Sequence, residues 1–203
     1  MTRKNTILLG IIISVIFLIY IILDYYGYIR YTLLRVNDLE YYIGKYKNIS
    51  KSNNKIIIHL TDISNNFELT LKTILDQSTR VDEIALSIPY SRMSNVNERW
   101  KSIISVYGYS KDYDDADMLI PILLREKEGD TIIILLNDIN LDNTFIDDMI
   151  DKSHANSNKI IKYKKSYLIK PSFFSPSVTD YQKGQGFELW MRKKSNASVL
   201  VMY

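Results

Sequence analysis

The sequence predicts an α/β domain with a mainly parallel sheet flanked by helices, preceded by one N-terminal transmembrane helix. Two observations lead to this fold class. An uncharged apolar run lies near the N-terminus, and farther along the chain short apolar runs alternate with segments of helical apolar spacing. We divide the 203 residues into an N-terminal segment (1–6), a membrane helix (7–23), a stalk and linker (24–54) and a folded domain (55–203).

The composition is that of a folded protein and excludes several kinds of site. Hydrophobic residues make up 46% and charged residues 24% of the chain, near the average for globular domains. The 26 basic and 23 acidic residues are interspersed, so nucleic acid is not expected as a partner. The absence of cysteine excludes disulfides and thiolate zinc sites. Heavy use of Ile, Lys, Asn and Tyr is typical of A/T-rich genomes, including those of many large DNA viruses.

The membrane helix is expected over 7–23. These 17 residues carry no charge, and at about 1.5 Å per residue a helix of this length spans about 25 Å, close to the thickness of the hydrocarbon layer. A cleaved signal peptide is the alternative. The bulky residues Asp24, Tyr25 and Tyr26 follow the run where a cleavage site needs small ones, so we favour a retained single-pass anchor.

The charges that flank the anchor predict its orientation. A basic pair at 3–4 precedes the apolar run, which favours a cytosolic N-terminus and a lumenal or external domain. Arg30 and Arg35 on the other flank weaken this bias. Sequons at Asn48 and Asn196 would be glycosylation acceptors only in a secretory lumen.

The stalk is expected to be helical over 28–46. Its apolar and aromatic residues recur close to helical spacing: Ile29, Leu33, Val36, Leu39, Tyr42, Ile43 and Tyr46. We expect this stripe to pack against the folded domain or the bilayer surface.

The folded domain is expected to alternate strands and helices. The predicted strands are 55–60, 81–88 and 131–136, and the predicted helices are 67–75, 117–124 and 143–150. Ligands of such sheets bind at the carboxyl ends of the strands. This edge is expected to contain Thr61 and Asp62, residues 89–92 and residues 137–140.

Three stretches of the domain resemble a known family. They are 56–77 followed by Asp82-Glu83-Ile84, Lys111-Asp112-Tyr113 leading into 119–123, and 129–138, which ends in Leu-Asn-Asp. In order and spacing, over about 55–150 with a fainter echo at 178–187, the chain resembles the A-type (GT-A) glycosyltransferases, in particular small bacterial and viral sugar transferases.

The resemblance implies a GT-A-like, Rossmann-type fold and a membrane-anchored transferase. Such an enzyme moves a sugar from a nucleotide-sugar donor to a glycan or protein acceptor. The donor-binding residues implied here are Thr61, Asp62, Asp112, Asn137 and Asp138. The family holds Mn²⁺ or Mg²⁺ with an Asp-x-Asp pair that neutralises the diphosphate leaving group. Of that motif this sequence keeps only Asp138, which is the expected metal ligand.

Departures from the family pattern leave a second interpretation open. Asn137 and Ile139 replace the outer carboxylates of the metal motif. Where the family has Gly-Pro and, farther on, Lys, this sequence has Asp114, Asp115 and Met118. The lysine cation that lies near the phosphate in the family is therefore missing. No catalytic base is assigned. The alternative function is therefore a catalytically inactive transferase-fold protein that serves as a binding or membrane-associated module. A third interpretation is an unrelated membrane protein whose domain binds other proteins.

Other polar features are assigned structural roles. Glu188, expected in a strand, is interpreted as a solvated residue more readily than as the base. The spacing of 138–149 lacks the Gly and Glu of an EF-hand calcium loop. The acidic run at 112–117 is typical of helix capping. His59 lies in an apolar run and is expected to be a hydrogen-bonded core residue, while His154 lies in a polar segment.

Overall fold

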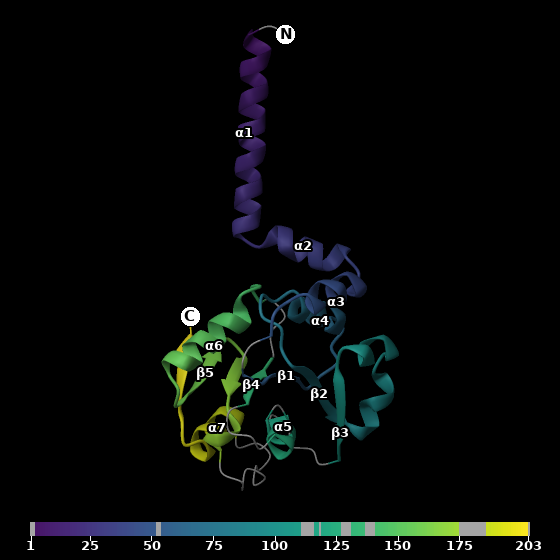
Figure 1. Ribbon diagram of the computed structural model, residues 1–203, viewed down its shortest axis with the longest axis vertical. Coiled ribbons are helices and arrows are strands. Elements are labelled where there is room, and N and C mark those ends of the chain that lie inside the picture. Colours follow the sequence, from purple (N-terminus) through teal and green to yellow (C-terminus); the bar gives the residue numbers. More distant parts are fainter. Residues whose placement is uncertain are drawn as a thin grey trace.

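Three layers, with helices on both faces of one sheet, form the folded domain, and one long helix projects from it (Figure 1). The computed structural model describes residues 3–51, 54–110, 116–117, 119–126, 131–136, 141–174 and 186–202. The helices are α1 (Arg3–Tyr25), α2 (Tyr28–Val36), α3 (Leu39–Lys47), α4 (Phe67–Leu75), α5 (Ile120–Arg125), α6 (Phe145–Ala155) and α7 (Phe187–Lys194). Short 3₁₀ helices are η1 (Tyr90–Asn95), η2 (Glu98–Ser102) and η4 (Pro171–Phe173).

The sheet has seven strands in the order β3-β2-β1-β4-β6-β5-β7. Its strands are β1 (Ile56–Leu60), β2 (Glu83–Pro89), β3 (Ser105–Tyr109), β4 (Ile132–Leu135), β5 (Lys159–Tyr163), β6 (Ser166–Ile169) and β7 (Ser198–Met202). β6 pairs antiparallel with both of its neighbours, and every other pairing is parallel. The predicted α/β class with a mainly parallel sheet is therefore confirmed.

Alternating side chains of the central strands supply two cores. From β1, Ile56, Ile58 and Leu60 join the core under α2, α3, α4 and α6, while Ile57 joins the core under α5 and α7. Successive side chains of a strand point to opposite faces, so a strand with an apolar residue at every position is buried on both sides. This explains why the continuous apolar runs of the sequence became the central strands.

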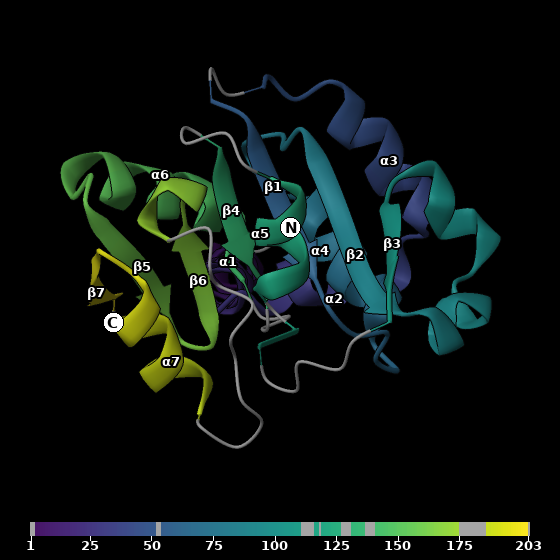
Figure 2. The same cartoon turned by 90° about the horizontal axis from the view of Figure 1, so that it is seen from below.

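The N-terminal helix is the only one in the described part of the chain that is long and apolar enough to cross a membrane. The candidate span is Ile7–Tyr25, and none of its apolar side chains is buried by the rest of the protein. In Figure 1 α1 stands on the side of the sheet that α2, α3 and α4 cover. Figure 2 looks along α1 and shows the sheet face-on, with α5 and α7 on the near side.

Helices α2 and α3 pack on the domain. Leu34 of α2 and Leu39 and Tyr42 of α3 are buried in the core that covers α4. The Tyr46 hydroxyl accepts a hydrogen bond from the backbone N–H of Val81 at 2.8 Å, and also donates to its carbonyl oxygen at 3.2 Å. The stalk that was expected to be helical over 28–46 is thus two helices separated by Asn37 and Asp38, and most of its apolar stripe is turned toward the domain.

The C-terminal part of the sheet departs from simple strand–helix alternation. β5 and β6 form a hairpin through a tight turn at Lys164, whose φ is 51°. A two-residue connection joins only antiparallel strands, because a parallel neighbour needs a long crossover. β6 therefore runs against the rest of the sheet, which local apolar patterns did not predict.

Candidate functional site

The strand order creates a switch point between β1 and β4. From β1 the chain passes through α4 on one face to β2, and it enters β4 from α5 on the other face. In doubly wound sheets ligands bind at the carboxyl ends of the strands where this reversal occurs. The backbone N–H of Leu136 donates to the carbonyl oxygen of His59 at 3.1 Å, so the ends of β4 and β1 lie side by side.

A pocket of about 550 Å³ lies at this carboxyl edge, beside the end of β1. The segment after β1 and helix η1 after β2 line it with Asp62, Ile63, Ser64, Asn65, Arg92 and Asn95. It therefore combines one carboxylate, one guanidinium, two amides and a hydroxyl.

The two charged side chains of the pocket contact each other. Arg92 Nη1 donates to Asp62 Oδ1 at 3.0 Å, and both side chains are more than half exposed. An exposed ion pair of this kind contributes about 0–1 kcal/mol. A ligand can therefore replace either partner at little energetic cost, which makes the guanidinium available to an anion.

Local packing fixes the two walls of the pocket. The N–H of Phe67 donates to the carbonyl oxygen of Ser64 at 3.0 Å, which closes the turn into α4. Phe67 is buried against Trp100, with ring centroids 4.7 Å apart. On the other wall η1 lies over β3, where a side chain at Gly108 would come closer than 3.0 Å to Tyr90 and Met93. Glycine at this position leaves room for the side chains of Tyr90 and Met93 over the strand.

His59 is a core residue, as predicted. It is buried in β1, and a ring nitrogen lies 2.8 Å from Ser87 Oγ of β2. The register pairs His59 with Ala85 and with Leu135 of the neighbouring strands. The imidazole is therefore inside the sheet layers, close to the carboxyl edge but covered.

The expected donor-binding residues fall into two groups. Thr61 and Asp62 follow β1 at the carboxyl edge, and Asp62 lines the pocket. Asp112, Asn137 and the expected metal ligand Asp138 lie outside the described residues. Their proximity to Asp62 therefore stays a prediction.

Sequence reasoning missed part of the pocket. Arg92 falls in the stretch assigned to the carboxyl edge, but no role was given to it, and Asn95 was not considered. Both residues follow the strand that ends at Pro89, and this position was the feature of the sequence that could have indicated them. Within the described ranges, no group of three His, Asp or Glu side chains is arranged to hold a metal ion.

Glu188 lies in helix α7, so its expected place in a strand was wrong. Phe187, Trp190 and Met191 bury one face of this helix. The Glu188 carboxylate accepts hydrogen bonds from Lys162 Nζ and Tyr167 Oη, and these bonds lower the pKa of the carboxyl group. Burial, together with the contact to Glu188, raises the pKa of Tyr167. A carboxylate stabilised in its ionised form is suited to a structural ion pair.

Of the predicted acidic run, Asp117 is described and accepts a hydrogen bond from Tyr109 Oη at 2.7 Å. This contact joins the end of β3 to the segment that leads into α5.

Comparison of the chain with protein-family models, with curated proteins and with solved structures found no match in any of the three.

Proposed function

We propose that this chain is a membrane-anchored, glycosyltransferase-like protein that binds a nucleotide-sugar donor at the carboxyl edge of its sheet. The observation that carries the proposal is the Asp62–Arg92 pocket beside the switch point of a β3-β2-β1-β4 sheet. This is where mononucleotide-binding α/β folds hold their ligands. The sequence resemblance to A-type glycosyltransferases supplies the substrate class.

Arg92 is the group proposed to bind the donor diphosphate. A guanidinium offers planar, paired donors that match phosphate oxygens, and its bonds to them are charge-assisted. Asn65, Asn95 and Ser64 line the same pocket and offer both donors and acceptors to the nucleoside. The pocket volume of about 550 Å³ lies within the range of small-molecule sites.

The described residues do not by themselves make a metal site. Asp62 is the one carboxylate among the described residues that line the pocket, and it is already paired with Arg92. The proposed Mn²⁺ or Mg²⁺ would bind at Asp138, which lies outside the described residues, and would neutralise the leaving diphosphate. Among the described residues of the pocket, Arg92 is the one proposed to neutralise the charge of the diphosphate.

The anchor is proposed to span a membrane once, with a cytosolic N-terminus and a lumenal or external domain. Both sequon asparagines, Asn48 and Asn196, are exposed. Expression in a eukaryotic secretory system tests this orientation. We expect a mobility shift that endoglycosidase removes and that Asn48→Gln together with Asn196→Gln abolishes. Labelling of the domain by a membrane-impermeant reagent only from the cytosolic side would contradict it.

The donor site is tested by calorimetric titration of the full chain in nanodiscs with uridine and guanosine diphosphates and their sugars. We use the full chain because α2 and α3 contribute to the core. We expect micromolar binding, about −8 kcal/mol, of at least one nucleotide. Titrations with and without manganese determine whether that binding requires the cation.

A matched pair of arginine variants localises the binding. Arg92→Gln removes the proposed phosphate contact, and charged hydrogen bonds of this kind are worth about 1.5–3 kcal/mol, or about 10- to 100-fold in affinity. Arg99→Gln is the control, since Arg99 is similarly exposed but pairs with Glu40 at 3.5 Å. Equal affinities in the two variants, or no nucleotide binding by a folded protein, would refute the proposed site.

A catalytically inactive binding module is the second candidate. Two observations favour it: the proposed metal motif retains only Asp138, and Glu188 is engaged by Lys162 and Tyr167. The two candidates differ in turnover. An active transferase releases nucleoside diphosphate from its donor in the presence of acceptor or water, whereas a binding module retains the donor intact.

A further inference from the structure

The chain turns sharply where the membrane helix ends. Gly27 adopts a φ of 71°, in the left-handed region that glycine enters without steric cost. Its carbonyl oxygen accepts a hydrogen bond from the N–H of Tyr31 at 3.0 Å, so α2 begins directly after the turn. In Figure 1 α2 consequently lies across the end of α1, between the anchor and the domain.

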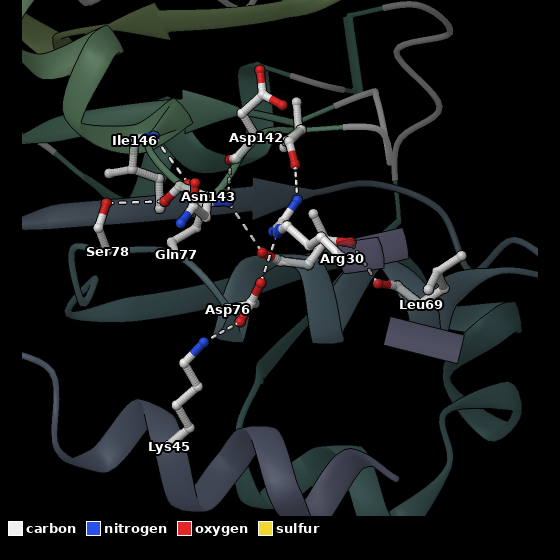
Figure 3. A network of polar contacts seen from close by, with 11 residues as sticks. Arg30, Lys45, Leu69, Asp76, Gln77, Ser78, Asp142, Asn143 and Ile146 are labelled. Atoms are coloured by element: carbon white, nitrogen blue, oxygen red, sulfur yellow. Dashed lines mark hydrogen bonds and ion pairs between the residues drawn. The ribbon is translucent and has the colours of Figure 1, made fainter. Parts of the chain in front are cut away.

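The inner side of α2 is fastened to the domain through Asp76 at the end of α4. Arg30 Nε donates to Asp76 Oδ2 at 2.7 Å, and Arg30 Nη1 also donates to the carbonyl oxygen of Leu141. Lys45 of α3 pairs with the other oxygen of the same carboxylate, as Figure 3 shows. Leu34 is buried beside these contacts. The position of α2 on the domain is therefore fixed by both charge and apolar packing.

The same region, around the turn between α1 and α2, carries an exposed apolar surface, which we name the juxtamembrane patch. Its members are exposed apolar or aromatic residues on the end of α1, the following turn, α2 and α3: Tyr25, Tyr26, Tyr28, Leu33, Val36 and Tyr41. Four of the six are tyrosines, the residue type that favours the headgroup level of a bilayer because it has an apolar ring and a polar tip.

We propose that the juxtamembrane patch lies on the surface of the same bilayer that α1 crosses, with α2 in the interfacial layer. The inference rests on the proposed membrane anchoring. Continuity identifies lipid as the occupant, because the patch begins at Tyr25, the last residue of the candidate span. A helix that lies across the end of a membrane span and exposes apolar side chains fits the headgroup and acyl boundary.

Interfacial docking of α2 fixes the orientation of the whole domain. The core and the Asp76 contacts hold α2 and the sheet as one unit. Figures 1 and 2 show the sheet lying across the direction of α1, with α5 and α7 on the side away from it. The carboxyl edge of the sheet, where Asp62 and Arg92 lie, is then held to one side of α1.

The cysteine-free chain allows a direct depth measurement. Single cysteines at Ile16, Val36 and Leu189 carry a nitroxide label in the full protein in phosphatidylcholine nanodiscs. Val36 and Leu189 are similarly exposed, at 75% and 70%, but Leu189 lies on α7, on the opposite face of the sheet. Electron paramagnetic resonance then compares collision with oxygen, which concentrates in lipid, and with a water-soluble nickel complex.

We expect the label at Val36 to collide with the nickel complex several-fold less than the label at Leu189, and to report a shallow depth in the bilayer. Equal nickel accessibility at Val36 and Leu189, with the Ile16 label deep in the hydrocarbon, overturns the inference while the anchor stands. A water-accessible label at Ile16 overturns the anchoring itself. Circular dichroism of each labelled variant verifies that the fold is retained.

A second pair of variants tests the same surface without a label. Val36→Glu places a charge on the juxtamembrane patch, and Leu189→Glu places one on the distal face. We expect only Val36→Glu to increase proteolysis of the turn at Gly27 in nanodiscs. Equal proteolysis of the two variants overturns the inference.

Discussion

Removing the Asp76 carboxylate tests whether helices α2 and α3 are part of the folded unit. Asp76 caps the C-terminal end of α4, where the helix dipole disfavours a negative charge and nearby cations offset that cost. Arg30 and Lys45 supply them. We predict that Asp76→Ala destabilises the protein because both ion pairs disappear and the guanidinium of Arg30 loses its main acceptor.

The magnitude follows from the burial of each partner. The Asp76 and Arg30 side chains are only 10% and 25% exposed, and a hydrogen bond between charged groups of this kind is worth about 1.5–3 kcal/mol. Lys45 is 49% exposed, so its pair adds about 0–1 kcal/mol. We therefore expect the free energy of unfolding to fall by about 2–4 kcal/mol.

Urea unfolding of the full chain in detergent micelles measures this loss, with the fluorescence of Trp100 and Trp190 as the signal. Glu98→Ala is the matched control, since Glu98 is exposed and pairs only across one turn with Lys101 at 2.6 Å. We expect it to change stability by less than about 0.5 kcal/mol. If the two variants lost the same stability, Asp76 would not fasten α2 and α3 to the domain.

Three further predictions concern packing and titration. Leu39→Ala, a fully buried change in α3, should cost about 2–5 kcal/mol in urea unfolding, whereas exposed Leu33→Ala should cost little. Burial raises the pKa of Tyr46 to about 12, so the stability that it contributes should be intact below pH 10 and lost as the pH rises to about 12; absorbance titration of the wild type and Tyr46→Phe measures this. Gly108→Ala should push aside the exposed side chains of Tyr90 and Met93 in η1 and so weaken nucleotide binding through Arg92; unchanged calorimetric affinity would contradict this link.

The central elements of the fold could be predicted because their signals are local. The runs at 55–60 and 131–136 are apolar at most positions, and they became the doubly covered strands β1 and β4. Pro121 lies in the first turn of α5, where a proline removes no helical hydrogen bond. β3, β5 and β7 were not predicted, because most of their side chains are not fully buried and their sequences carry no continuous apolar pattern. The buried strand β6 is only four residues long and was not predicted either.

The candidate site could be predicted only in part. That Asp62 follows a central strand was evident from the sequence, and the carboxyl-edge rule then placed it near a ligand site. Its partner Arg92 is 30 residues away, and nothing in the local sequence of either residue indicates that the two side chains meet. Three of the five expected donor-binding residues, Asp112, Asn137 and Asp138, lie outside the described residues and stay predictions.

The sequence by itself determined the apolar N-terminal helix, the α/β class and the strands at the centre of the sheet, because long apolar runs and strands covered on both faces are recognisable from the hydrophobicity of consecutive residues. Only the tertiary structure decided the strand order, the reversed direction of β6 and the ion pair of the pocket. The contact between α2 and the domain through Arg30 and Asp76, which are 46 residues apart, was likewise evident only from the tertiary structure. Contacts of this kind depend on which surfaces meet when the layers pack, and periodicity along the chain does not encode that choice.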